Sequence, residues 1–126
     1  MRFVALMYTE PARTRAMTAE EHVEIKRKYE ELGTELLASG ELRNGCGMAY
    51  PAETRTLRRR REPADGPFHT GDTLLSAYWV LDCASPERAE AIAERMLDWH
   101  VTAVEVRAVH DSFGFGEDEG GDLGVG

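Results

Sequence analysis

Residues 74–87, LLSAYWVLDCASPE, decide the predicted fold because a strand and the start of a helix meet within them. Residues 74–82 are rich in aromatic and branched side chains, which is typical of a β-strand. Residues 85–87 then offer a serine N-cap, a proline suited to the first helical position and an acid for the first turn. A helix therefore follows the strand, with a buried stripe of Ala89, Ile92, Ala93 and Met96.

The chain upstream of this stretch predicts another strand and another helix. Residues 2–8 are largely apolar and stop at a Glu-Pro break, as an opening strand does. Thr18 and Glu21 have the spacing of a capping box, in which each side chain accepts a hydrogen bond from the other residue's amide. Gly40 provides the left-handed residue that commonly ends a helix. Between these caps runs a stripe at spacings of three and four: His22, Ile25, Tyr29, Leu32 and Leu36.

Further segments complete the order of elements. Residues 41–50 and 54–61 predict two less regular strands around a Pro-Ala turn, and residues 65–68, DGPF, are a turn signal. Residues 103–109 predict the last strand. The order strand, helix, one or two strands, strand, helix, strand is the split βαβ plan. We therefore expect a ferredoxin-like α+β domain with two helices on one face of a mainly antiparallel sheet.

Both faces of the predicted sheet are apolar. Successive side chains of a strand point to opposite faces, and the two strands with the clearest pattern divide as follows. In the first strand, Phe3, Ala5 and Met7 oppose Val4, Leu6 and Tyr8; in the later one, Leu75, Ala77, Trp79 and Leu81 oppose Leu74, Tyr78 and Val80. Two helices cover only one face, and each large side chain left in water on the other forgoes roughly 1.5–3 kcal/mol. No loop or tail segment is apolar enough to cover it, so we expect a homodimer formed with a symmetric second copy.

The composition narrows the class of protein and of partner. The formal net charge of −8 at pH 7 argues against nucleic acid and anionic membranes as partners. The apolar runs are too short to cross a bilayer, and the N-terminal one predicts a strand rather than a signal peptide, so we expect a cytoplasmic protein. We expect one domain over residues 1–112 and a flexible, Gly-rich acidic tail over residues 113–126. Cys46 and Cys83 lack the spacing of a zinc site or a disulfide framework, and we expect no metal or cofactor.

His22 is the first candidate for chemistry. It continues the inward stripe of the first helix one turn from the N-terminus, where the helix dipole favours a neutral imidazole. A neutral imidazole there suits a general base or a ligand contact. The alternative, and the commoner case, is a hydrogen-bonded, partly solvated histidine at the edge of the stripe.

A second group of candidates lies beside the turn before the central strand: Asp65, His69 and Asp72. A carboxylate next to an imidazole can orient it for proton transfer. Loops also collect such residues without any chemical role. If the turn and the helix start share one end of the sheet, His22 joins this group as the residue that Asp65 orients. His69, Asp72 and Tyr78 are then candidate substrate-binding residues.

Other charged residues have structural interpretations. Glu105 and Arg107 share one face of the last strand, which favours a cross-strand salt bridge or a solvent-facing rim. Residues 58–61 are four arginines, which either guard an exposed edge strand or bind an anion.

The turn Asp65-Gly66-Pro67-Phe68, followed at a distance by residues 78–82, YWVLD, resembles the DGPF branch of the YCII-related proteins. The resemblance runs from the first residue to about residue 109, and it includes residues 39–42 (SGEL) and 104–107 (VEVR). It implies a ferredoxin-like, dimeric α/β barrel, in agreement with the two apolar faces.

The resemblance also implies a function. Some relatives in the wider YCII group use a histidine and an aspartate for dehydrochlorination or related acid–base work on small ring compounds. His22 stands where YCII proteins tend to place their histidine, and Asp65 matches the motif aspartate. DGPF members are often encoded beside sigma factors, which implies a regulatory association with a sigma factor. The chain departs from the branch at residues 70–73, where Thr-Gly-Asp-Thr replaces Glu-Thr-Lys-Glu and the lysine is lost.

Two functions follow from these observations. In the first, a cavity between sheet and helices holds a small aromatic or lactone-like molecule, on which His22 acts as a base oriented by Asp65, as in a lyase or isomerase. In the second, the chain is a non-catalytic module that binds a small molecule or, through its acidic surface, a basic partner such as a sigma factor. A polar, convergent cavity favours the enzyme, and an apolar, closed one favours the binding module.

Overall fold

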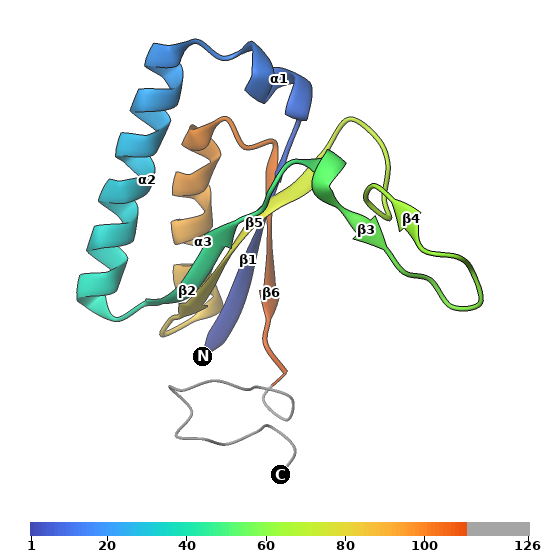
Figure 1. Ribbon diagram of the computed structural model, residues 1–126. Helices are drawn as coiled ribbons and strands as arrows, with labels where there is room; N and C mark the ends of the chain where they lie inside the picture. The colour runs from blue at the N-terminus through green and yellow to red at the C-terminus, as the bar shows by residue number, and fades with distance from the viewer. Residues whose placement is uncertain (111–126) are drawn as a thin grey trace.

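The computed structural model describes residues 1–110 and shows an antiparallel sheet with both long helices on one of its faces (Figure 1). The helices are α1 (Pro11–Ala16), α2 (Ala19–Ser39) and α3 (Pro86–Met96), with single turns of 3-10 helix at Pro51–Glu53 and Leu97–Trp99. The strands are β1 (Arg2–Thr9), β2 (Leu42–Gly47), β3 (Arg55–Thr56), β4 (Ala64–Asp65), β5 (Leu74–Asp82) and β6 (Ala103–Ala108).

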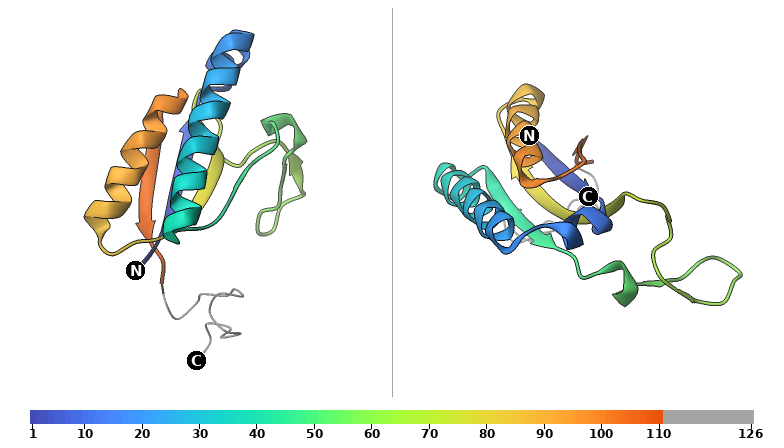
Figure 2. Two further views of the ribbon diagram at one scale, coloured as in Figure 1. Left: turned by 90° about the vertical axis from the view of Figure 1, so that its left-hand side faces the viewer. Right: turned by 90° about the horizontal axis from the view of Figure 1, so that it is seen from above.

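The main sheet has four strands in the order β2-β5-β1-β6, and each neighbouring pair is antiparallel. The two central strands are β1 and β5, so the stretch that predicted the fold lies in the middle of the sheet. α2 and α3 lie side by side on one face, and the opposite face carries neither of them (Figure 2). This strand order confirms the prediction of a ferredoxin-like α+β fold.

The predicted caps set the helix boundaries. The Glu21 amide donates to the Thr18 hydroxyl at 3.1 Å, and the Thr18 amide donates to the Glu21 carboxylate at 2.9 Å. Gly40 ends α2 with φ of +82°, a left-handed conformation that glycine adopts without steric cost. The Arg88 amide donates to the Ser85 hydroxyl at 3.2 Å, which begins α3 as predicted.

The core lies between the sheet and the two long helices. Its centre is Trp79, whose ring centroid lies 5.6 Å from that of Tyr29 and 5.4 Å from that of Trp99. Gly45 of β2 allows this indole to approach, because a Cβ at that position would lie 2.5 Å from the Trp79 Cδ1 atom. The remaining buried side chains include the predicted stripes: Phe3, Ala5, Met7, Leu32, Leu36, Leu81, Ala89, Ile92, Ala93 and Met96.

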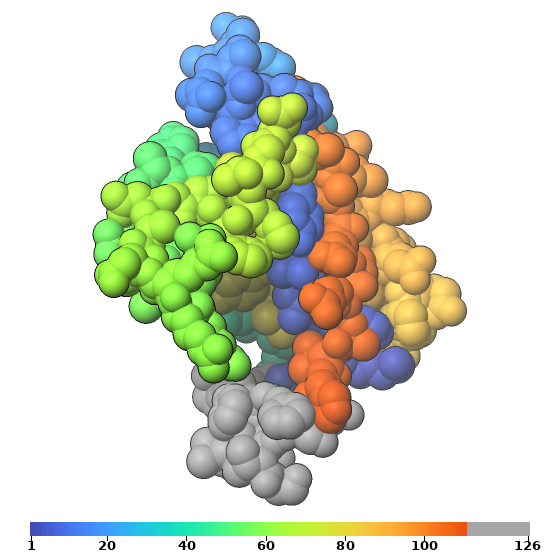
Figure 3. Space-filling model, turned by 90° about the vertical axis from the view of Figure 1, so that its right-hand side faces the viewer, coloured from blue at the N-terminus to red at the C-terminus, as the bar shows by residue number. Residues whose placement is uncertain are grey.

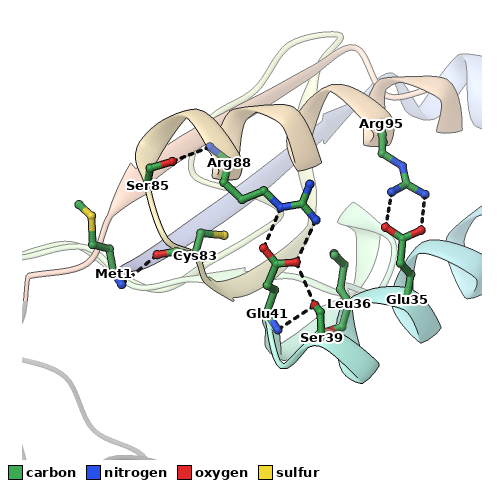
Figure 4. A network of polar contacts seen from close by, with 9 residues as sticks. All are labelled: Met1, Glu35, Leu36, Ser39, Glu41, Cys83, Ser85, Arg88 and Arg95. Atoms are coloured by element: carbon green, nitrogen blue, oxygen red, sulfur yellow. Dashed lines mark hydrogen bonds and ion pairs between the residues drawn. The ribbon is translucent and has the colours of Figure 1, made fainter.

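Two ion pairs join the end of α2 to α3 (Figure 4). Arg88 donates to both carboxylate oxygens of Glu41, at 2.8 and 2.9 Å, and the Ser39 hydroxyl donates to the same carboxylate at 2.9 Å. These hydrogen bonds, chiefly those from Arg88, hold the pKa of Glu41 below its ordinary value. Arg95 donates to both oxygens of Glu35, at 2.6 and 3.1 Å. Bidentate contacts of this kind fix one helix against the other.

The segment between β2 and β5 differs from the prediction. The expected strand over residues 54–61 is wrong: within this range only Arg55–Thr56 forms a strand, and it pairs with Ala64–Asp65 in a separate two-stranded hairpin. The arginines of residues 58–61 form the exposed end of this hairpin, where Arg60 has φ of +59°. We call residues 55–65 the arm; it stands away from the helices (Figure 1).

Two smaller differences lie at other breaks in the pattern. The Glu-Pro sequence after β1 does not simply end a strand but begins α1, because proline suits the first position of a helix. The predicted tail, residues 113–126, lies outside the described residues.

β5 contains a bulge that strict alternation did not predict. Met7 pairs with Ala77 and Tyr8 pairs with Leu75, so Ser76 is an extra residue in β5. The Ser76 hydroxyl donates to the Met7 carbonyl at 3.2 Å, and its carbonyl accepts from the Met48 amide at 2.8 Å. Leu75, predicted on the same face as Trp79 and Leu81, is instead 40% exposed, and it lines a cleft together with Tyr8.

Candidate functional site

The face of the sheet that the long helices leave uncovered, which we call the open face, is mostly apolar. Its central side chains are half-buried although neither α2 nor α3 packs against them: Val4, Leu6, Tyr8, Tyr78 and Val80. The hydroxyls of Tyr8 in β1 and Tyr78 in β5 supply polar groups on this apolar surface.

A cleft of about 570 Å³ opens on this face where the arm joins the sheet. Figure 3 looks at the open face: the arm, in green, stands beside β1 and β6, in blue and orange, and the surface between them is recessed. Its volume is in the range of small-molecule sites, roughly 300–1,000 Å³. We call it the arm cleft. Its walls are mainly apolar, and the largest apolar members are Met48, Pro51, Phe68, Leu74 and Leu75.

The DGPF turn builds one wall of the arm cleft. Asp65 accepts from Arg55 across the arm at 2.9 Å, and Gly66 then turns the chain with φ of +96°. The Gly66 amide donates to the Thr54 carbonyl at 2.7 Å, and the Gly66 carbonyl accepts from the Thr56 hydroxyl at 2.7 Å. Glycine adopts this left-handed conformation without strain. The turn therefore returns residues 67–69 to the sheet, where they line the cleft.

His69 is the member of the predicted group that reaches the arm cleft. Its ring centroid lies 5.0 Å from that of Phe68, and both residues line the cleft. Asp72 is exposed in the loop before β5 and does not line the cleft. Asp65 is bonded to Arg55, and its side chain is 83% exposed. Of the three residues of the predicted group, His69 is therefore the one that lines the arm cleft.

Besides His69, the arm cleft is lined by a second titratable side chain, that of Tyr8. Its hydroxyl donates to Glu105 Oε1 at 3.0 Å. This hydrogen bond, together with burial and the charge of the carboxylate, raises the pKa of Tyr8, so the phenol keeps its proton. A phenol that donates one hydrogen bond can still accept another at its oxygen. Tyr8 can therefore receive a donor group of a ligand.

The Tyr8–Glu105 pair was not predicted from the sequence. Glu105 was expected to form a cross-strand salt bridge or to lie at a solvent-facing rim. In the observed register Leu6 lies opposite Glu105, which makes Tyr8 the diagonal neighbour of Glu105 on the same face. The sequence does show that Glu105 is a polar residue between two valines. The residue that it contacts, however, depends on the register of β1 and β6.

Tyr78 lies on the open face but not among the residues that line the arm cleft. It is opposite Cys46 of β2, and its hydrogen bond with that thiol raises the pKa of Tyr78. Both cysteines are free; Cys46 is exposed and Cys83 is buried.

His22 does not belong to the inward stripe, which corrects the sequence-based prediction. It is exposed in the first turn of α2, and the contacts of this helix with the core begin at Ile25, one turn further along. The arm, which carries Asp65, stands on the opposite side of the sheet from α2 (Figures 1 and 2). His22 and Asp65 therefore do not meet within one chain, and the arm cleft lies on the face opposite the long helices.

Among residues 1–110, no three histidine, cysteine or carboxylate side chains gather as they would to hold a metal ion. Each helix in this part of the chain is too short or too polar to span a bilayer.

The fold and the cleft together define a ferredoxin-like α+β domain with a pocket on the sheet face that its long helices leave open. The chain belongs to the YCII-related domain family, whose model matches residues 1–112.

One solved structure to which the chain is similar is 5-chloro-2-hydroxyhydroquinone dehydrochlorinase from Burkholderia phenoliruptrix, in complex with 2,5-dihydroxybenzoquinone. The similarity has a TM-score of 0.47 and 13% sequence identity, and it covers 94% of this chain and 98% of that chain. No curated protein matches the sequence.

Proposed function

We propose that this chain binds a small organic molecule in the arm cleft and transfers a proton to or from it, with His69 as the base. The observation that carries the proposal is that His69 and Tyr8 line the same cleft of about 570 Å³, whose other walls are mainly apolar. Apolar walls with a few polar groups are typical of small-molecule sites.

The chemistry assigns a separate task to each side chain. Imidazole is the side chain that most readily exchanges protons near neutral pH, which suits His69 to act as a general base. Tyr8 stays protonated through its hydrogen bond to Glu105. A ligand hydroxyl that donates to the Tyr8 oxygen is thereby oriented, and His69 takes up a proton from the ligand. The base is assigned to His69 rather than to His22 because His22 lies away from the cleft.

We propose further that a second copy of the chain covers the open face. The support is the apolar surface that continues from this face to the mouth of the cleft, where Met48 is 45% exposed, Phe68 65% and Leu75 40%. A second sheet against this surface would bury it and would exclude water from the cleft. Exclusion of water strengthens the electrostatic interactions on which proton transfer depends.

Binding without catalysis is the second candidate function. It is favoured by the mainly apolar walls of the arm cleft and by the small number of titratable side chains in its lining, which are Tyr8 and His69 among the described residues. In that case the cleft recognises a ligand mainly by its apolar surface, and the ligand leaves unchanged.

Proton exchange measured by NMR distinguishes the two candidates. A library of small ring compounds with an acidic C–H next to a carbonyl is incubated with the protein in D₂O. We expect bound compounds to exchange that hydrogen for deuterium, and His69→Gln to slow the exchange by about 10²–10⁴-fold while binding persists. Binding to the wild type without exchange would support the second candidate.

His22→Gln is the variant that separates the proposal from the sequence-based prediction. Loss of exchange in His22→Gln with full exchange in His69→Gln would return the role of base to His22. Binding that is unaffected by Phe68→Asp, a substitution in the wall of the cleft, would contradict the location of the site.

A further inference from the structure

A smaller pocket adjoins the arm cleft. It has a volume of about 140 Å³ and shares with the cleft the wall residues Met48, Ala49, Pro51, Leu74 and Leu75. Its remaining walls come from the end of β1, from α1 and from residues next to the shared ones. The two spaces therefore adjoin along these residues, and His69 and Tyr8 line the larger one.

Arg15 of α1 lines the smaller pocket and is the charged residue among the described residues that form its walls. Within residues 1–110 its guanidinium makes no hydrogen bond or ion pair. Arg13, two residues earlier in the same helix, is instead paired with Glu10 at 3.4 Å. Carboxylates also neutralise the arginines in the longer helices, as Glu41 does for Arg88. Arg15 is exposed, and its unpaired guanidinium in the wall of a mainly apolar pocket is available to a ligand.

We propose that Arg15 anchors a carboxylate of the ligand, so that the site takes a small organic acid with an apolar body. This inference rests on the proposed function of the arm cleft and names the class of its ligand. A guanidinium presents paired donors that match the two oxygens of a carboxylate. With the carboxylate at Arg15, the apolar body lies along Leu74 and Leu75, which line both spaces, and the far end reaches Tyr8 and His69.

The charge of the protein favours a monoanion. A single arginine compensates one negative charge. The formal net charge of −8 repels ligands that carry more than one negative charge. Phosphate esters, which carry a second charge near neutral pH, are therefore weaker ligands than carboxylates of the same body.

Benzoate and its neutral counterpart benzamide test the anchor. Each is titrated against the full-length protein while the amide signals of Leu74 and Leu75 are followed by NMR. We expect the wild type to bind benzoate at least about tenfold more tightly than benzamide, because hydrogen bonds to charged groups are the stronger ones. Arg15→Gln should remove this preference by weakening the binding of benzoate, and phenyl phosphate should bind the wild type more weakly than benzoate.

Arg13→Gln is the matched control, because Arg13 lies in the same helix but outside the pocket and should keep the preference for benzoate. Equal binding of benzoate and benzamide at these amides would overturn the anchor and leave the arm cleft as the site. A preference that survives Arg15→Gln would overturn it as well. Signals that respond to neither probe would contradict both the anchor and the cleft.

Discussion

The two faces of the sheet have similar sequences and different surroundings. On the helix-covered face, Phe3, Ala5 and Met7 of β1 are 4%, 0% and 3% exposed. On the open face, the alternate residues of the same strand are as apolar but remain half-buried. We therefore assign the stability of the fold to the covered face, and the arm cleft and the proposed association to the open face. The predictions below separate these two roles.

The largest effect is expected on the covered face. Ile92 is 0% exposed, so Ile92→Ala should lower the free energy of unfolding by about 2–5 kcal/mol through lost burial and the cavity that remains. Leu97→Ala is the control, since this side chain is 45% exposed and should cost less than about 1 kcal/mol. Chemical denaturation measures both. Equal losses of unfolding free energy in the two variants would contradict the claim that burial on the covered face stabilises the fold.

A charge on the open face should break association rather than folding. Leu6→Asp places a carboxylate in the middle of the apolar surface, and we expect it to weaken the proposed dimer by more than about 100-fold, because an unpaired charge is costly to bury. Thermal unfolding should stay cooperative. Val23→Asp, on a side chain of α2 that is 70% exposed, should leave association unchanged. Sedimentation velocity that shows the same assembly for Leu6→Asp and wild type would refute the role of this face.

A pair of glycines in β2 tests the close packing of the covered side. Gly45→Ala would place a Cβ 2.5 Å from the Trp79 Cδ1 atom, and we expect a loss of about 1–3 kcal/mol in the free energy of unfolding. Gly47→Ala, in the same strand, meets nothing within 4 Å and should cost less. Urea denaturation of the two variants compares them directly, and a larger loss for Gly47→Ala would contradict the packing described.

The smallest effect concerns the ion pair between Glu41 and Arg88. Because the folded state lowers the pKa of Glu41, the pair stabilises the fold above the ordinary pKa of glutamate, and this contribution is lost as the pH falls through the lowered value. The Arg88 side chain is 41% exposed, so the contribution should be below about 1 kcal/mol. The stability difference between wild type and Glu41→Gln should therefore shrink on acidification. A difference that does not change with pH would remove this interpretation.

The sequence predicted the features of the fold that depend on near neighbours. The capping box of Thr18 and Glu21, the left-handed Gly40 and the stripe of α3 are all confirmed, because each is set by residues within a few positions of one another. Alternation also predicted that Phe3, Ala5 and Met7 share one face of β1, since successive side chains of a strand point to opposite faces. That this face is the buried one depends on where the helices pack.

The site was harder to predict because it depends on contacts between distant residues. Tyr8 and Glu105 are separated by 97 positions, and they meet only through the register of β1 and β6. Leu75 lines the cleft because of the bulge at Ser76, which no alternation reveals. His22 was assigned to the stripe because its spacing fits, but spacing does not show where a helix leaves the sheet.

The most direct test of the role of the open face is the mass of the wild-type protein in solution at micromolar concentration, measured by light scattering. We expect the mass of two chains, because a second copy buries the apolar surface of Val4, Leu6 and Val80 that the helices leave in water. The mass of one chain at that concentration would contradict the claim that a second copy covers this face.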